Sequence, residues 1–215
     1  MKNKYLILKK VISTELTNFV FNYFLMKRQV AKTLFEQKYI SPFSTEFGTW
    51  QDEQVPNTYS HYSDIVMETL LQSILPIMEK HTKLKLIPTY SYARIYKKGD
   101  VLKRHKDRFS CEISTTLNLG GDHWPIYLSP KENVGIPNDK KGITAASNAK
   151  GVKVDLKPGD MLIYRGMELE HWREPFEGKD CAQVFLHYNN AKSADAEKNR
   201  HDRRPHLGLP SWFKH

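Results

Sequence analysis

Between Pro88 and Tyr188 the sequence consists of short β-rich runs separated by turn residues, and this feature limits the possible folds most. Six runs enriched in β-branched and aromatic residues alternate there with Gly, Pro and Asp. They are residues 89–96, 110–119, 124–128, 152–156, 161–164 and 182–188. Many short strands at this spacing are typical of an all-β sandwich or barrel.

Two amphipathic helices are predicted before the β-rich region. Apolar residues recur at three- and four-residue steps over residues 13–37, and Ser13 or Thr14 can cap the start of this helix. A second helix is predicted over residues 63–81, where Pro76 should bend it or end its regular part. Its expected inward-facing residues are Ile65, Val66, Met67, Leu70, Leu71, Ile74 and Leu75. Two helices followed by six or more strands imply a mostly β protein (α+β), in which N-terminal helices pack on one face of the β core.

The length and composition agree with one folded domain. The chain has 215 residues, of which 40% are hydrophobic, and this is enough to bury a sizeable core. We expect residues 1–215 to form a single domain, with helical support in 1–87, the β core in 88–190 and a tail in 191–215. Residues 39–59 and 129–151 show no periodicity and are predicted to be surface loops. The tail ends in apolar residues that could dock on the body: Leu207, Leu209, Trp212 and Phe213.

Charge and cysteine content narrow the class of protein. A formal charge of +9 favours an acidic partner such as nucleic acid, an anionic peptide or a dicarboxylate, although scattered surface lysines explain it equally well. Cys111 and Cys181 alone provide neither a disulfide framework nor a Cys-rich zinc site, which favours the cytoplasm. Apolar residues 5–8 are too few for a signal peptide, and no run approaches the ~20 apolar residues of a membrane span. We therefore expect a soluble protein without a membrane partner.

Three residues form a candidate metal site. His105 and Asp107 stand at the end of a predicted strand, and His171 follows the turn-then-strand phrase of residues 158–164. Residues i and i+2 of an extended chain project to the same side, so the first two side chains can reach one metal together. Two imidazoles and one carboxylate are the facial ligand set of non-haem Fe(II) oxygenases. A His-x-Asp pair alone is a weak signal, because the chain has nine histidines, and the two strand contexts strengthen it.

Further motifs accompany this triad in a fixed order. They are Tyr-Ala-Arg-Ile-Tyr at 92–96, Gly-Gly at 120–121, Pro-Gly-Asp at 158–160, and Pro175 four residues after His171. With them, residues 88–188 resemble the 2-oxoglutarate- and Fe(II)-dependent dioxygenases, and within these the prolyl 4-hydroxylase-like branch. The resemblance implies a double-stranded β-helix (jelly-roll) core with helices on its larger sheet. It also implies an oxidoreductase that uses Fe(II), O2 and 2-oxoglutarate and releases succinate and CO2; ascorbate is a further candidate cofactor.

The cation that binds the distal carboxylate of 2-oxoglutarate departs from the family pattern. The branch places Arg or Lys nine or ten residues after the second histidine, where this chain has Asp180 and Cys181. Lys179 would point away from the pocket in a regular strand unless a bulge rotates it. Arg173 shares the face of His171 and is our predicted anchor, with Tyr96 donating a phenolic hydrogen bond. A surface arginine paired with Glu174 or Glu177 is an almost equally good interpretation of Arg173.

Other polar and aromatic residues are weaker candidates. Arg94 and Asn118 could line the pocket, or could make a structural ion pair and a strand-end hydrogen bond. Trp124 and Trp172 flank the predicted pocket mouth, although core packing is the commoner role of tryptophan. His187 is predicted to be a buried core histidine. The remaining histidines are expected at the surface: His61, His81, His123, His201, His206 and His215.

Three functions remain in competition at this point. The leading one is a hydroxylase of a peptidyl, including prolyl, or small-molecule substrate. A nucleic-acid dealkylase with the same iron centre is favoured by the charge of +9, but the sequence lacks the aromatic-interleaved basic stripe of base-reading proteins. The third is a non-catalytic jelly-roll protein that binds a structural metal or none.

Overall fold

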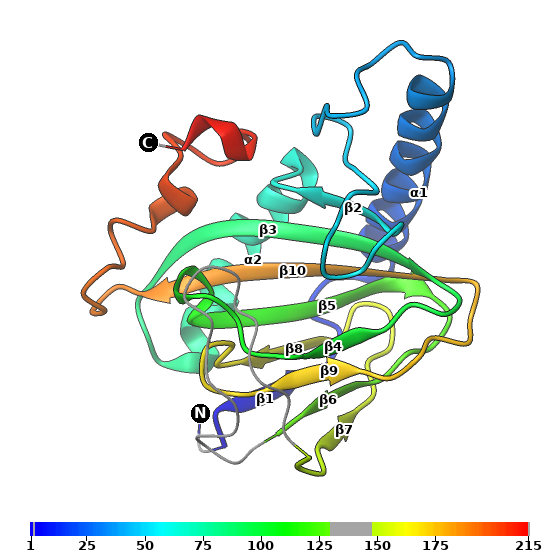
Figure 1. The fold of residues 1–215 in the computed structure, drawn as a ribbon. Coiled ribbons are helices and arrows are strands. Elements are labelled where there is room, and N and C mark those ends of the chain that lie inside the picture. Colours follow the sequence, from blue (N-terminus) through cyan, green and yellow to red (C-terminus); the bar gives the residue numbers. More distant parts are fainter. Residues whose placement is uncertain (2, 130–147, 215) are drawn as a thin grey trace.

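Two antiparallel sheets and two helices make up the fold (Figure 1). The computed structural model describes residues 1, 3–129 and 148–214. In sheet order, the larger sheet consists of β1 (Tyr5–Leu8), β8 (Met161–Tyr164), β5 (Ile113–Gly121), β10 (Asp180–Asn190), β3 (Leu86–Lys97) and β2 (Tyr59–Tyr62). The smaller sheet consists of β4 (Leu102–His105), β9 (His171–Arg173), β6 (Ile126–Leu128) and β7 (Val152–Val154). The predicted mostly β class with N-terminal helices is confirmed.

Both helices begin where the sequence predicted. The side chain of Ser13 accepts a hydrogen bond from the Leu16 amide at the start of α1 (Thr14–Glu36), and Asp64 caps α2 (Ile65–Thr82) through the Met67 amide. Helix α2 continues through Pro76 instead of ending there. The prediction that Ile65 faces inward is wrong, because this first residue of α2 lies at the helix edge and is 70% exposed.

The main hydrophobic core lies between the helices and one face of the larger sheet. Val20 and Phe24 of α1 and Leu71 of α2 belong to this core, together with residues of β3, β5, β8 and β10. Side chains alternate along β10: Val184 belongs to this core, and its neighbour Phe185 lines a pocket on the opposite face. One face of the larger sheet is therefore used for packing, while the other is available for a site between the two sheets.

Six predicted β-rich runs correspond to β3, β5, β6, β7, β8 and β10, while four strands are not predicted. Strands β1, β2, β4 and β9 have no predicted run of their own, and β4 and β9 were expected only as the extended segments that carry His105 and His171. Strands β1 and β2 form the two edges of the larger sheet, so residues 1–87 contribute strands as well as helices. No helix in the described part of the chain has the length and apolar character needed to cross a membrane.

The loops and the tail differ from one another in how far the predictions hold. Residues 39–58 contain no helix or strand, as predicted, whereas most of the predicted loop 129–151 lies outside the described residues. The tail docks mainly through polar groups: Arg204 is buried against Glu68, at 2.8 Å. Leu207 packs against the core, but the prediction for Trp212 is wrong, since its side chain remains 64% exposed. Both cysteines are buried and free.

Candidate metal centre and pocket

The three predicted metal ligands converge at one point between the sheets. His105 ends β4 and pairs directly with His171, the first residue of β9, so that their ring centroids are 4.2 Å apart. The Oδ1 atom of Asp107 lies 3.7 Å from Nε2 of His105 and 3.4 Å from Nε2 of His171. All three ligand atoms lie within 4.8 Å of one another, so they can hold one metal ion.

Hydrogen bonds orient each of these side chains. The Nδ1 atoms of His105 and His171 lie 2.7 and 3.0 Å from the carbonyl oxygens of Lys103 and Leu169, which makes these nitrogens the protonated donors. The lone pair on each Nε2 is then directed at the common point. The hydroxyl of Ser114 donates to Oδ2 of Asp107 at 2.7 Å and leaves Oδ1 available.

The protonation states also suit a metal. Burial and the neighbouring His171 lower the pKa of His105 to about 3, so this imidazole is neutral at physiological pH. Burial alone would raise the pKa of Asp107, but the electrostatic interaction and hydrogen bond with His171 outweigh it and hold this pKa well below its usual range. A neutral imidazole and an ionised carboxylate are the forms that bind metal without first releasing a proton.

Two further residues at this centre were not recognised in the sequence. A side chain at Gly166 would place its Cβ 2.1 Å from Oδ2 of Asp107, and the Gly166 carbonyl accepts a hydrogen bond from the Asp107 amide. The hydroxyl of Tyr164 lies 3.4 Å from Nε2 of His171. A signal for Gly166 existed, because it lies two residues after a predicted strand and precedes His171 by five residues.

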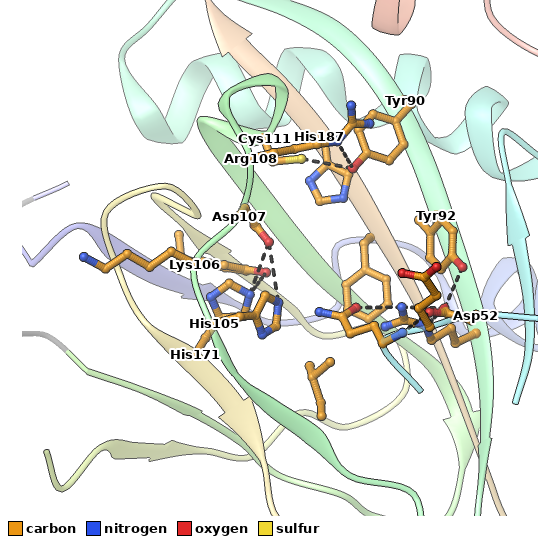
Figure 2. A pocket seen from close by; sticks show the side chains of 16 residues that line it. Asp52, Tyr90, Tyr92, His105, Lys106, Asp107, Arg108, Cys111, His171 and His187 are labelled. Carbon is orange, nitrogen blue, oxygen red and sulfur yellow. Dashed lines mark hydrogen bonds and ion pairs between the residues drawn. The ribbon is translucent and has the colours of Figure 1, made fainter. Parts of the chain in front are cut away.

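A cavity of about 490 Å³ opens beside the triad (Figure 2). Tyr90, Tyr92 and Phe185 from the larger sheet line it, so much of its wall is aromatic. Residues 52–54 of the irregular connection form another part of the wall, and the sequence gave no motif that pointed to them. The cavity therefore combines a metal-binding corner with an aromatic wall and a loop.

Arg94 and Asn118, the two weaker pocket candidates, differ in their surroundings. Arg94 lines the cavity and also makes a buried ion pair with Asp52, at 2.5 Å, so both of its predicted roles are observed. Burial alone would raise the pKa of Asp52, but the charge of Arg94 and a hydrogen bond from Tyr92 keep it below the usual value. Asn118 instead donates its side-chain amide to the Leu156 carbonyl at 2.7 Å, a structural hydrogen bond.

The predicted anchor residues lie deep between the sheets. Arg173 is 1% exposed; its Nη1 donates to the Trp124 carbonyl and its Nη2 lies 3.4 Å from the hydroxyl of Thr116. Its Nε has no hydrogen-bond partner within the described residues. Tyr96 is buried against Trp124, and its hydroxyl accepts a hydrogen bond from Arg94 at 3.3 Å. The alternative interpretation of Arg173 as a surface residue is wrong, because its side chain is enclosed.

The other basic candidate lies outside the pocket. The side chain of Lys179 is exposed, while its backbone amide donates to Asp122 at 2.6 Å. Asp180, which follows it, pairs with Arg28 of α1 at 2.6 Å and therefore faces the helix. No rotation of this strand end brings Lys179 inward.

The remaining aromatic and histidine predictions have mixed outcomes. Trp124 packs against Phe176, and Trp172 stacks on Tyr127 under Arg104, so both have packing roles. His187 is buried as predicted, but it also lines the cavity.

The surface prediction for the other histidines fails at one position. It is wrong for His61, which is buried with its Nδ1 3.2 Å from Asp64 because β2 packs beside α1 and α2. The exposed histidines are His81, His123 and His206; His201 is half-buried, and His215 lies outside the described residues.

Comparison with known proteins identifies the fold. No protein-family model matches the sequence, and the search of curated proteins gives no match. A prolyl-4-hydroxylase from Pseudomonas putida is similar in structure, with a TM-score of 0.58, 13% identity, and coverage of 87% of this chain and 92% of that chain. HygX from Streptomyces hygroscopicus, solved with nickel and 2-oxoglutarate, has a TM-score of 0.54 and 13% identity over 90% of this chain and 89% of its own.

A viral enzyme is also similar to this chain in structure. The collagen prolyl hydroxylase of Paramecium bursaria Chlorella virus-1, solved with 2-oxoglutarate, has a TM-score of 0.51 and 10% identity over 86% of this chain and 95% of that chain. The resemblance predicted from the sequence motifs is confirmed at the level of structure. The chain has the fold of the 2-oxoglutarate- and Fe(II)-dependent oxygenases.

Proposed function

We propose that this protein is an Fe(II)- and 2-oxoglutarate-dependent oxygenase that hydroxylates a peptidyl, including prolyl, or small-molecule substrate and releases succinate and CO2. In this proposal residues 1–215 form one cytoplasmic domain, and the two antiparallel sheets are the halves of a double-stranded β-helix. The convergence of His105, Asp107 and His171 beside a cavity is the observation that carries the proposal.

The donor set fits Fe(II). Two imidazole nitrogens and one carboxylate oxygen would bind the ion, and such a set of three protein ligands would leave positions for a chelating cosubstrate and O2. His105 and Asp107 are held in their deprotonated forms, and Ser114 and backbone carbonyls fix the orientation of the three ligands. A structural zinc site would instead enclose its metal with four protein ligands.

The surroundings of Arg173 fit the distal carboxylate of 2-oxoglutarate. A buried guanidinium is expensive to leave without a negative partner, and no ion pair with Arg173 occurs within residues 1, 3–129 and 148–214. A carboxylate there would receive charge-assisted hydrogen bonds from Arg173, and the phenol of Tyr96 would add another. Arg94 is less suited to this role because Asp52 already neutralises it.

The chain's own residues would position the reactants and exclude water. When bound, iron, 2-oxoglutarate and O2 would together supply the oxidation, in which one oxygen atom goes to succinate and the other into a C–H bond of the substrate, with release of CO2. His105, Asp107 and His171 would hold the metal at the cavity wall, and Arg173 with Tyr96 would orient the cosubstrate. Tyr90, Tyr92 and Phe185 would contact the substrate and keep the site dry.

The cavity size and the neighbours support the range of substrates proposed. A volume of about 490 Å³ accommodates a side chain of a peptide or a compact small molecule. The P. putida and viral neighbours are prolyl hydroxylases, and HygX has been solved with hygromycin B bound. These similarities support the oxygenase class without choosing between the two kinds of substrate.

Succinate formation from 2-oxoglutarate tests the proposal directly. The full-length protein with Fe(II), O2 and ascorbate as reductant should produce succinate slowly even without its substrate. The matched control is Asp107→Asn, which preserves the shape of the side chain but removes the anionic ligand, and it should produce none. If the iron-loaded wild-type protein binds no 2-oxoglutarate and forms no succinate, a non-catalytic metal-binding role replaces this proposal.

A further inference from the structure

The cations in the cavity wall are matched by carboxylates, although the chain as a whole carries a charge of +9. Three basic residues line the cavity: Arg94, Lys106 and Arg108. Their partners come from three different parts of the chain. The electrostatic character of the cavity is therefore not that of the protein surface.

Arg94 is neutralised by the irregular connection before β2. Its Nε and Nη2 lie 2.7 and 2.5 Å from Oδ2 of Asp52, and Nη2 donates to the side chain of Gln54 at 2.6 Å. Both members of the ion pair are 6% exposed, and Tyr92 also donates to Asp52 at 2.6 Å. Figure 2 shows Asp52 and Tyr92 on the cavity wall opposite the metal ligands. The donor groups of Arg94 that face the cavity are thus already occupied.

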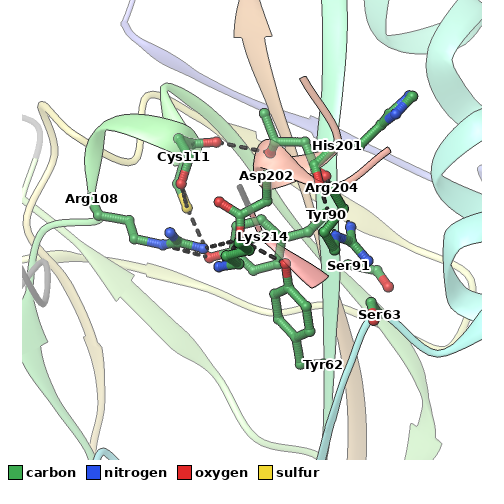
Figure 3. A network of polar contacts seen from close by, with 12 residues as sticks. Tyr62, Ser63, Tyr90, Ser91, Arg108, Cys111, His201, Asp202, Arg204 and Lys214 are labelled. Atoms are coloured by element: carbon green, nitrogen blue, oxygen red, sulfur yellow. Dashed lines mark hydrogen bonds and ion pairs between the residues drawn. The ribbon is translucent and has the colours of Figure 1, made fainter. Parts of the chain in front are cut away.

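Arg108 is paired with a carboxylate of the C-terminal tail, which it shares with Lys214. Asp202 accepts hydrogen bonds from Arg108 at 2.8 Å, from Tyr62 at 2.6 Å and from Lys214 at 2.5 Å (Figure 3). The guanidinium of Arg108 lies over the ring of Tyr90, 4.5 Å from its centroid. The backbone at residues 201–203 is left-handed, which is unfavourable for residues other than glycine, and this conformation presents Asp202 to the body of the protein.

We call the part of the cavity lined by Tyr90, Tyr92 and Phe185 its substrate end. Lys106 is turned away from this end. In Figure 2 its side chain extends away from Asp52 and Tyr92. The charges of Glu170 and Glu168 act on it. The exposed carboxylate of Glu53 adds a negative group to the cavity wall.

Arg173 provides the contrast. The cavity-lining Arg94 and Arg108 each have a carboxylate partner, whereas no ion pair involves Arg173 in the described part of the chain. An anion that enters the site can therefore gain a cation at the anchor position of the cosubstrate. At the substrate end it would have to displace Asp52 or Asp202, or lie beside them with unfavourable repulsion.

We propose that Asp52 and Asp202 are specificity-determining residues that exclude anionic groups from the substrate end of this cavity. The group presented to the metal is then uncharged or cationic, as in a neutral or basic peptide side chain, and not a phosphodiester or a carboxylate. This inference rests on the proposed function only in so far as the excluded molecule is called a substrate. The charge argument itself depends on the residues of the cavity alone. It works through repulsion of the wrong ligand rather than through added attraction for the right one.

Inorganic phosphate is a suitable probe, because releasing an arginine should create an anion site. The full-length protein is loaded anaerobically with Fe(II) and 2-oxoglutarate, so that the metal and Arg173 are occupied, and phosphate binding is measured by calorimetry. Asp52→Asn keeps the side-chain shape but removes the charge opposite Arg94, and it should bind phosphate at least about tenfold more tightly than the wild type. Asp202→Asn should do the same through Arg108, independently of the first variant.

Two controls make the result specific to the cavity. Glu36→Gln releases Lys32 from an exposed ion pair on α1, and it should bind phosphate no better than the wild type. The double variant Asp52→Asn/Arg94→Gln removes both charges and should lose the gained affinity. Circular dichroism confirms folding; if Asp52→Asn fails to fold, Asp202→Asn decides the outcome.

The proposal is overturned if the wild type binds phosphate as tightly as the folded variants, or if the folded variants show no gain. Repeating the titrations without Fe(II) and 2-oxoglutarate separates this inference from the proposed function. A gain in phosphate affinity in a protein that forms no succinate would support the charge argument and refute the oxygenase activity alone.

Discussion

Arg173→Met should stabilise the cosubstrate-free protein and remove most of its response to 2-oxoglutarate. The guanidinium is 1% exposed and Nε has no hydrogen-bond partner among the described residues, so the folded state bears the cost of burying a charge. Methionine retains an unbranched apolar stem of similar length. Replacing buried ionic groups by apolar ones of similar volume is neutral or stabilising by about 1–4 kcal/mol, and we expect a gain of this order.

The effect on binding should have the opposite sign. Removing one partner of a buried, hydrogen-bonded charge pair costs about 2–5 kcal/mol, which raises the Kd by between roughly 30-fold and several thousand-fold. At a 2-oxoglutarate concentration of about 100 times its Kd, the wild-type free energy of unfolding should rise by about 2.7 kcal/mol. At the same concentration the variant should gain less than about 1 kcal/mol.

Urea denaturation of the metal-loaded protein, with and without 2-oxoglutarate, measures both effects in one assay. Lys179→Met is the matched control, since the same substitution is made at an exposed position whose side chain lies outside the pocket. It should keep the full wild-type response. If Arg173→Met responds like the wild type while Lys179→Met does not, the strand carrying the anchor has been assigned incorrectly.

Three other predictions concern the metal, the acid stability and the tail. Alanine at each metal-ligand position should abolish iron retention, measured by metal analysis, while circular dichroism stays unchanged, because these side chains lie outside the hydrophobic core. The positions are His105, Asp107 and His171. Burial lowers the pKa of His61 from 6.5 despite its contact with Asp64, so the unfolded chain binds this proton more readily and the free energy of unfolding should fall as the pH drops below 6.5. His61→Gln should reduce that fall in urea titrations between about pH 7 and pH 5. Glu68→Met should cost about 3–5 kcal/mol of stability by leaving Arg204 charged and buried, and Glu68→Met/Arg204→Met should recover most of the loss in the same assay.

The sequence predicted those features that have a local signature. Both helices show a clear period and a polar cap, and the metal triad lies at strand ends whose spacing can be recognised without a structure. Arg173 was assigned to the pocket side by simple alternation from His171, and its burial agrees with this assignment. Alternation works here because β9 is regular between the two residues.

Features made by long-range contacts could not be predicted. Asp52 lies in a segment without any period, and only the folded chain brings it to Arg94, 42 residues later. The tail was expected to dock through Leu207, Leu209, Trp212 and Phe213. Leu207 does pack against the core, but the buried polar contacts are made by Arg204 and Asp202, whose partners are distant in sequence. Charged residues in a tail usually lie on a solvated surface, so the amino-acid composition of the tail gives no indication that these residues are buried.

The smaller sheet is the part of the molecule whose integrity depends most on the metal. Its four strands have three or four residues each, and its first pairing brings His105 directly opposite His171. A bound ion would join β4 to β9 as a cross-link that closes a long segment of chain. Short strands with few backbone hydrogen bonds open at low free energy, whereas β3 and β10 are long and lie centrally in the larger sheet. Removing the metal with a chelator should therefore increase local opening of the smaller sheet. Amide hydrogen exchange should then accelerate in β4 and β9 under conditions where the protein as a whole stays folded.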